Sequence, residues 1–154
     1  MGFYLGHRDT NDLDLFTLTD FRRFLMRRGQ EGVVIDLARE QMAQQYPEKN
    51  VINGIRVDRP EEILANKLCT LLSRAEIRDL VDVRALEITG YRVENAITAA
   101  AAKDAGLTPA QLAWVLRQIT IGEDASPPGG VSAEELREYL NTLIQRLTRL
   151  AFPR

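Results

Sequence analysis

Two aspartates separated by one residue are the first feature of the sequence with a chemical use. Asp12 and Asp14 flank Leu13 at the start of a short apolar stretch that favours a strand. In an extended segment, residues two apart point to the same side with Cα atoms roughly 6.6 Å apart, so these carboxylates can converge. A divalent cation removes the repulsion between them, and oxygen ligands suit Mg²⁺ or Mn²⁺. The pair therefore predicts a metal site, and the alternative is an exposed acidic turn.

A third acid, Asp36, follows the β-branched run at 33–35. If strands at 13–16 and 33–37 lie side by side, Asp12, Asp14 and Asp36 share one pocket. Such a set of carboxylates clamps two metal ions about 3.5–4 Å apart for an in-line phosphoryl displacement. The alternative is that Asp36 simply ends its strand in water.

Three basic residues provide the complementary charge. Lys67, Arg74 and Arg78 are spaced by seven and four residues, which places them along one side of a continuous helix. Such a stripe can meet a triphosphate, and we expect Lys67 to contact a ligand rather than to hold the fold. The alternative is a solvated face with weak ion pairs, among them the i,i+4 pair of Arg78 with Asp82.

Composition limits the class of protein. The 154 residues are 45% hydrophobic and 27% charged, which is typical of an ordinary globular chain. A net charge of −2 argues against a domain whose bulk charge grips nucleic acid, and one Cys with one His argues against a zinc site. There is no apolar run of about 20 residues and no signal-peptide layout, so we expect a cytoplasmic protein.

The residues that could do chemistry must be positioned by two parts of the chain, a mixed segment at 1–57 and a helical segment at 58–154. Residues 1–57 are mixed in period: we expect strands at 13–16 and 33–37, a strand or hairpin arm at 51–57, and a short helix from Thr19 to Arg28 that ends at Gly29.

Residues 58–154 read as almost entirely helical. We expect a long helix from Pro60 that stops at Gly90, with a break near 74–76 left open, and further helices over 93–105, after Thr108-Pro109 and after Ser132. The connector at 122–131 is expected to have no element of its own. The last helix carries an apolar seam formed by Leu136, Leu140, Leu143, Leu147 and Leu150. The predicted fold class is α+β, a small mixed sheet followed by a helical bundle.

Several ordered blocks resemble the nucleotidyltransferase family of abortive-infection toxins, the AbiEii/AbiGii type within the DNA polymerase β superfamily. They are Gly6–Thr17, Val34–Asp36, Asn53–Val57, Glu62–Leu68, Arg74 and Arg78–Asp82. The resemblance covers roughly residues 2–90. The C-terminal helices are compatible with such proteins but carry no distinctive motif.

The resemblance implies roles for these residues. Asp12 and Asp14 fall on the family's metal-binding acid pair, and Asp36 on the acid that helps metal ions activate the acceptor hydroxyl. Lys67 matches the helical lysine expected to touch nucleotide phosphates, and Arg78 begins the last motif. Arg74 of the basic stripe is a further candidate for nucleotide contact, and His7, beside the acids, could either donate to a phosphate or cap a turn.

The resemblance also implies an activity and partners. The implied activity is metal-dependent transfer of a nucleotidyl group from an NTP to a hydroxyl on tRNA or protein. The implied system is a toxin–antitoxin pair, in which this chain is the toxin and a separate antitoxin protein is its partner.

One departure from the family leaves a second interpretation open. Members place a Gly-Gly-Ser or Gly-Gly-Thr turn shortly before the segment equivalent to Phe3–Arg8, and the sequence given has none there. We therefore expect either a nucleotidyltransferase core that lacks part of its sheet over 1–57, or an incomplete module that binds nucleotide or protein without catalysis. An incomplete sheet leaves an unpaired edge, so we also expect a dimer or larger assembly.

Overall fold

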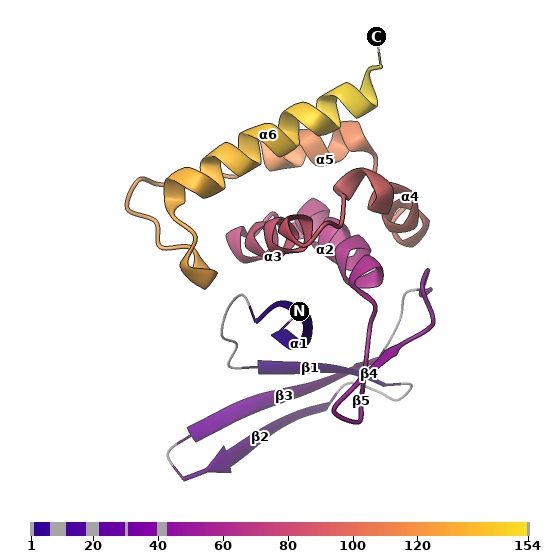
Figure 1. Cartoon of the computed structure of the whole chain (residues 1–154), viewed down its shortest axis with the longest axis vertical. Coiled ribbons are helices and arrows are strands. Elements are labelled where there is room, and N and C mark those ends of the chain that lie inside the picture. Colours follow the sequence, from indigo (N-terminus) through magenta and orange to yellow (C-terminus); the bar gives the residue numbers. More distant parts are fainter. Residues whose placement is uncertain (1, 7–11, 18–21, 30, 40–42, 154) are drawn as a thin grey trace.

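The chain combines small sheets with a larger set of helices, and the predicted α+β class is confirmed (Figure 1). The computed structural model describes residues 2–6, 12–17, 22–29, 31–39 and 43–153. The sheets lie at one end of the molecule and the helices at the other, with the short helix α1 (Gly2–Leu5) between them. None of the described helices is long and apolar enough to cross a bilayer.

The first sheet has three strands in the order β1-β3-β2. They are β1 (Asp12–Thr17), β2 (Arg22–Arg28) and β3 (Glu31–Arg39). β1 runs parallel to β3, and β2 runs antiparallel to it. The two strands predicted at 13–16 and 33–37 are therefore confirmed, they lie side by side, and the sheet is mixed as expected.

The helix predicted from Thr19 to Arg28 is wrong, because residues 22–28 form β2. The basic residues and Gly29, which look like the end of a helix, instead lead into a hairpin. Gly29 has φ of 63°, a left-handed conformation that glycine adopts at little cost, and Arg28 pairs with Glu31 across the turn. A short isolated helix is marginal in water, so the ladder along seven residues of β2 prevails.

The second sheet is a hairpin of β4 (Asn50–Ile52) and β5 (Ile55–Val57). Its turn is Asn53-Gly54, with φ of 52° and 78°, the pattern of a tight two-residue hairpin turn. Of the two alternatives for 51–57, the hairpin arm is confirmed.

Five longer helices follow: α2 (Pro60–Arg74), α3 (Ile77–Ile88), α4 (Val93–Lys103), α5 (Pro109–Leu116) and α6 (Ala133–Ala151). Ala75 has φ of 50° and interrupts the first predicted helix, which confirms the break that the sequence left open. The connector does contain an element, a single 3-10 turn η1 at Pro128–Gly130, so the expectation of none was wrong. Pro127 and Val131 on either side of that turn are buried, which holds the connector against the helices.

The core lies within the helices. Every described residue classed as buried belongs to residues 60–147. The leucine seam of α6 is buried as predicted, with one correction: Leu150 is 43% exposed, because it lies in the last turn of the helix. None of the described residues of β1, β2 and β3 is buried.

A buried ion pair ties the loop that follows β3 to the helices. Glu62 of α2 pairs with Lys103 of α4, and neither side chain is more than 1% exposed. One oxygen of Glu62 accepts hydrogen bonds from the backbone N–H groups of Gln45 and Tyr46 at 3.0 and 2.9 Å. Lys103 also donates to the carbonyl of Ala43 at 3.1 Å. Residues 43–46 are therefore fixed at the junction of α2 and α4.

Candidate functional site

The backbone of the three-stranded sheet brings the predicted acids together. Asp14 of β1 and Asp36 of β3 are register partners on neighbouring parallel strands, and Asp12 pairs with Val34 two residues earlier. Adjacent strands lie about 4.8 Å apart, and alternate residues of a strand share a face. The positions of Asp12, Asp14 and Asp36 therefore share one face of the sheet. The side chains of Asp12 and Asp14, and all of His7, lie outside the described residues.

Asp36 has a cationic partner that the sequence analysis missed. Arg23, which lies opposite Asp36 on β2, donates two hydrogen bonds to its carboxylate at 2.6 and 2.7 Å. The Asp36 side chain is only 16% exposed, so the alternative that it ends its strand in water is wrong. The hydrogen bonds from Arg23 hold the pKa of Asp36 below its usual value, which keeps the carboxylate ionised at neutral pH. Sequence reasoning missed Arg23 because it placed this residue on a helix; the alternation of Phe24 and Met26 was the available signal of a strand.

The acids fit a hard divalent cation in their chemistry. All three supply carboxylate oxygens, the ligands that Mg²⁺ and Mn²⁺ prefer. Each oxygen of Asp36 already accepts one hydrogen bond from Arg23, and a carboxylate oxygen has a second lone pair available. Among the side chains that the structure describes, no three His, Cys, Asp or Glu groups are arranged to hold a metal ion. The predicted metal site thus depends on Asp12 and Asp14 and stays a prediction.

Lys67 is part of an ion-pair network between α2 and α3. Its ammonium lies 2.9 Å from Asp79 and 2.6 Å from Asp82, and both acids are fully buried. Arg74 donates to the same Asp79 at 2.9 and 3.1 Å. Burial alone raises the pKa of Asp79, but the hydrogen bonds from Arg74 and Lys67 outweigh it and hold that pKa below the usual value. Lys67 therefore pairs with two buried acids, a structural contact that the sequence did not predict. Its weight in stability and its contact with a phosphate both stay predictions.

The predicted basic stripe is divided between two helices. Lys67 and Arg74 belong to α2 and meet at Asp79, whereas Arg78 lies beyond the break at Ala75, on α3. Arg78 pairs with Glu76 at 2.7 Å, while Asp82 pairs with Lys67. Arg74 is 41% and Arg78 49% exposed, so both guanidinium groups are accessible to an anion.

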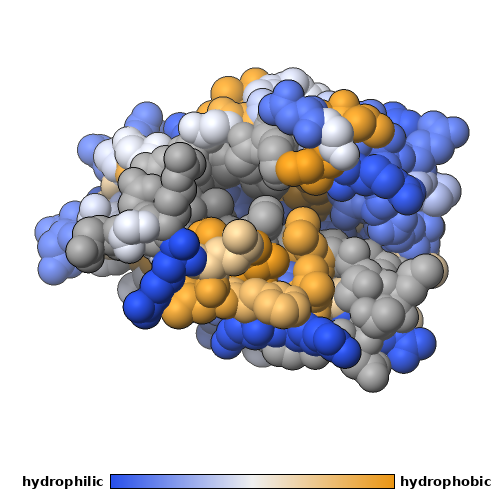
Figure 2. Space-filling view, turned by 90° about the horizontal axis from the view of Figure 1, so that it is seen from below, coloured by the Kyte–Doolittle hydropathy of each residue, from blue (hydrophilic) through white to orange (hydrophobic). Residues whose placement is uncertain are grey.

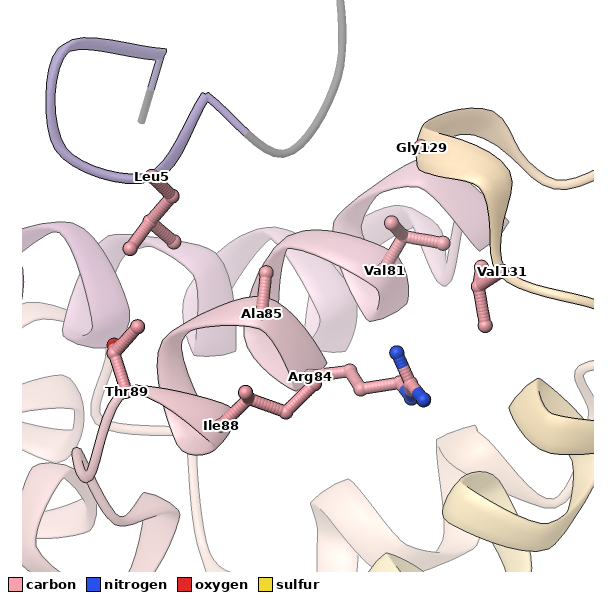
Figure 3. Close-up of a pocket in the computed structure, with 8 residues that line it drawn as sticks. All are labelled: Leu5, Val81, Arg84, Ala85, Ile88, Thr89, Gly129 and Val131. Atoms are coloured by element: carbon pink, nitrogen blue, oxygen red, sulfur yellow. The ribbon is translucent and has the colours of Figure 1, made fainter.

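A pocket lies away from these residues, between α1, α3 and η1 (Figure 3). Its lining consists of Leu5, Val81, Arg84, Ala85, Ile88, Thr89, Gly129 and Val131. Arg84 is the one charged residue among them, and it lies 3.7 Å from Glu135. None of the predicted metal or nucleotide residues lines this pocket, so the candidate chemistry belongs to the sheet and to the α2–α3 network.

The comparison with protein families identifies the chain. The model of the nucleotidyl transferase AbiEii toxin family, of type IV toxin–antitoxin systems, matches residues 21–152. The chain belongs to the AbiEii family. No curated protein and no solved structure matches it significantly.

The AbiEii match includes the C-terminal helices but leaves out the N-terminal residues. It runs through α6, so the C-terminal helices, in which the sequence showed no distinctive motif, are part of the family region. It contains Asp36, Lys67 and both candidate arginines, and it begins after His7 and the pair of acids on β1. The family is thus established on the strands β2 to β5 and the helices α2 to α6.

Proposed function

We propose that this AbiEii-family protein transfers a nucleotidyl group from an NTP to a hydroxyl acceptor, as the toxin of a type IV toxin–antitoxin system. The observation that carries the proposal is the register of the first sheet. It puts Asp14 beside Asp36, with Asp12 two residues away on the same face. Membership of a family of nucleotidyl transferases supports the same chemistry.

In this proposal Asp12 and Asp14 hold Mg²⁺ or Mn²⁺, and Asp36 completes the site as the catalytic carboxylate. A bound divalent ion supplies Lewis-acid stabilisation of the phosphoryl oxygens and lowers the pKa of the acceptor hydroxyl. Asp36, kept ionised by Arg23, is suited to hold a cation rather than to take up a proton. The acceptor hydroxyl loses its proton to solvent, and its oxygen bonds to the α-phosphorus as the bond to the leaving pyrophosphate breaks.

The nucleotide phosphates are proposed to meet Arg74 and Arg78, with Lys67 and His7 as further contacts. Arg74 shares the carboxylate of Asp79 with Lys67, and Arg78 pairs with the exposed Glu76. The side chains of both arginines remain at least two-fifths exposed. A guanidinium binds a phosphate through paired hydrogen bonds, which suits it to this role. The acceptor is proposed to be tRNA or a protein, and the regulating partner an antitoxin protein.

A second candidate function is a module that binds nucleotide or protein without transferring a group. One observation favours it: Arg23 occupies both oxygens of Asp36 and already neutralises the charge that a metal ion would meet.

A transfer assay separates the two candidates. The full chain is incubated with each of the four NTPs labelled at the α-phosphate, with Mg²⁺ or Mn²⁺, and with total tRNA or protein as acceptor. We expect label to move to one acceptor class with the wild type and with Asp124→Asn, which changes an exposed acid of the connector. Asp14→Asn and Asp36→Asn should lower the rate at least about 100-fold, the scale on which loss of a metal-binding catalytic group acts. Nucleotide binding without transfer by the wild type supports the module instead.

A further inference from the structure

One face of the three-stranded sheet is apolar, and the described part of the chain packs no buried core against it. Alternation along the strands puts six described apolar side chains on this face, opposite the face that carries the acids. These residues, which we call the apolar sheet face, are Leu15, Phe24, Met26, Val33, Ile35 and Leu37. Phe24 and Met26 are 46% and 58% exposed, and the other four are half-buried.

Within the described residues, the helical core does not cover the apolar sheet face. None of its residues belongs to the hydrophobic core or to the partly buried side chains packed against that core. Seen from below, hydrophobic side chains gather in an area in the lower middle of the view, with hydrophilic side chains along its left and lower edges (Figure 2). A sheet with one apolar face is normally covered by a second layer of structure, so the chain as described lacks that layer.

The dimensions of the apolar sheet face suit a single helix. Three strands span about 10 Å from first to last, which matches the diameter of an α-helix. From Val33 to Leu37 the face extends about 13 Å along the strands, which a helix covers in about nine residues, or two and a half turns.

The charge at one end of the face indicates which side chains a bound helix should carry there. Arg22 of β2 is the register partner of Leu37 on β3, and Arg39 follows Leu37 by two residues on β3. Both arginines are exposed and share the face, so one end of the apolar area is basic. Acidic side chains at the helix end above these arginines complement that charge, and acids are also favoured in the first turn of a helix.

We propose that the apolar sheet face docks an amphipathic helix of a partner protein, with its acidic N-terminal end over Arg22 and Arg39. A second copy of this chain fits less well. A face of about 10 by 13 Å is much smaller than the roughly 800 Å² per partner of a stable interface. This proposal is independent of the proposed nucleotidyl transfer, because it concerns the opposite face of the sheet.

The test uses the full chain and two synthetic helical peptides as probes. Both peptides carry the same leucine stripe; one has glutamates in its first two turns, and the other has lysines at the same positions. Binding is followed by fluorescence anisotropy and located by hydrogen exchange. Met26→Glu is compared with Leu25→Glu, a matched control in which the neighbouring residue, also 58% exposed, lies on the opposite face.

We expect the glutamate peptide to bind more tightly than the lysine peptide and to protect amides of β2 and β3. Met26→Glu should weaken its binding at least about ten-fold, because it replaces an apolar contact with a charge that would have to be buried. Leu25→Glu should leave binding within about two-fold of the wild type, as is usual for a surface change outside the contact. Arg22→Glu should remove the preference for the glutamate peptide.

Three outcomes overturn the proposal. The first is that neither peptide binds, and the second is that both peptides bind equally well. The third is that Met26→Glu and Leu25→Glu weaken binding to the same extent. Light scattering adds a further check: a dimer of the wild type that Met26→Glu dissociates would put a second copy on this face in place of the partner helix.

Discussion

The helical part of the molecule encloses a core, whereas the described residues of its strands do not. Residues 60–147 contain all of the described buried residues, and leucines of α2, α3, α5 and α6 are fully enclosed. The strands β1, β2 and β3 contain no described buried residue, yet they carry the candidate catalytic acid. The difference shows that the enclosed core and the candidate acids lie in different parts of this chain: the helices form the core, and the sheet presents side chains on both of its faces.

A few polar contacts join the two parts, in addition to the packing of Leu5 and Tyr46 against the helical core. Glu62 and Lys103 fix residues 43–46, and the amide of Asn50 donates to the hydroxyl of Tyr4 at 2.8 Å. Removal of one partner from a buried pair leaves an uncompensated charge, which costs far more than the pair contributes. The junction is therefore where a single change should have the largest effect.

Lys103→Met should destabilise the chain by about 3–5 kcal/mol, because Glu62 then stays buried without its cation. Urea unfolding followed by circular dichroism measures the change. The double variant Lys103→Met/Glu62→Met removes both charges and should recover much of the loss. A single variant as stable as the wild type would show that the pair is solvated and does not hold the junction.

Leu143→Ala should cost about 2–5 kcal/mol, the usual range for a leucine truncated in an enclosed core. Leu25→Ala, in the exposed strand β2, should change stability by no more than about 0.5 kcal/mol. The same denaturation experiment compares the two. Equal losses would mean that the sheet is as tightly packed as the helices, which would contradict the difference between the two parts.

Lys67→Met should lower stability by about 1–3 kcal/mol, because Asp82 and Asp79 are buried and lose a hydrogen-bonded cation. Arg78→Met is the matched control: Arg78 and its partner Glu76 are both exposed, so stability should change by less than about 1 kcal/mol. Thermal melting measures stability, and NTP binding by calorimetry measures the proposed phosphate contact. If Lys67→Met binds NTP as well as the wild type while melting lower, Lys67 is structural only.

The smallest effect is a dependence of stability on pH within the helices. Arg146 of α6 donates to Glu87 at 2.6 Å and to Glu94 at 2.7 Å. Burial raises the pKa of Glu87, but hydrogen bonds from Arg146, the N–H of Val93 and Tyr139 outweigh it and lower that pKa. The pKa of Glu94 is also lowered, first by the hydrogen bonds from Arg146.

Because both folded-state pKa values are lowered, the two glutamates stabilise the fold fully above the unfolded pKa of about 4.3. That contribution is lost as pH falls below this value toward the folded-state pKa. Melting temperatures from pH 7 to pH 3 should show this loss in the wild type, and Arg146→Leu should flatten it. An unchanged acid slope in the variant would place the titration elsewhere.

The sequence alone predicted the elements whose signals are local. Pro60, the capping box of Ser132 with Glu135, and the β-branched run of β3 each mark an element that the structure contains. β2 was missed because its basic residues and Gly29 suit a helix end and a hairpin equally well. The pairs Arg23–Asp36 and Glu62–Lys103 join residues 13 and 41 apart in sequence, and no spacing rule connects such residues before the strands and helices are arranged.

The central claim is that the acids of β1 and β3 form one metal site on a sheet that the helices support without enclosing. Calorimetric titration of the full chain with Mn²⁺ tests it most directly. We expect the wild type and Asp124→Asn to bind Mn²⁺ alike, and Asp14→Asn to bind it far more weakly with an unchanged helical circular-dichroism signal. Equal binding by Asp14→Asn and the wild type, or no binding by either, would contradict the claim.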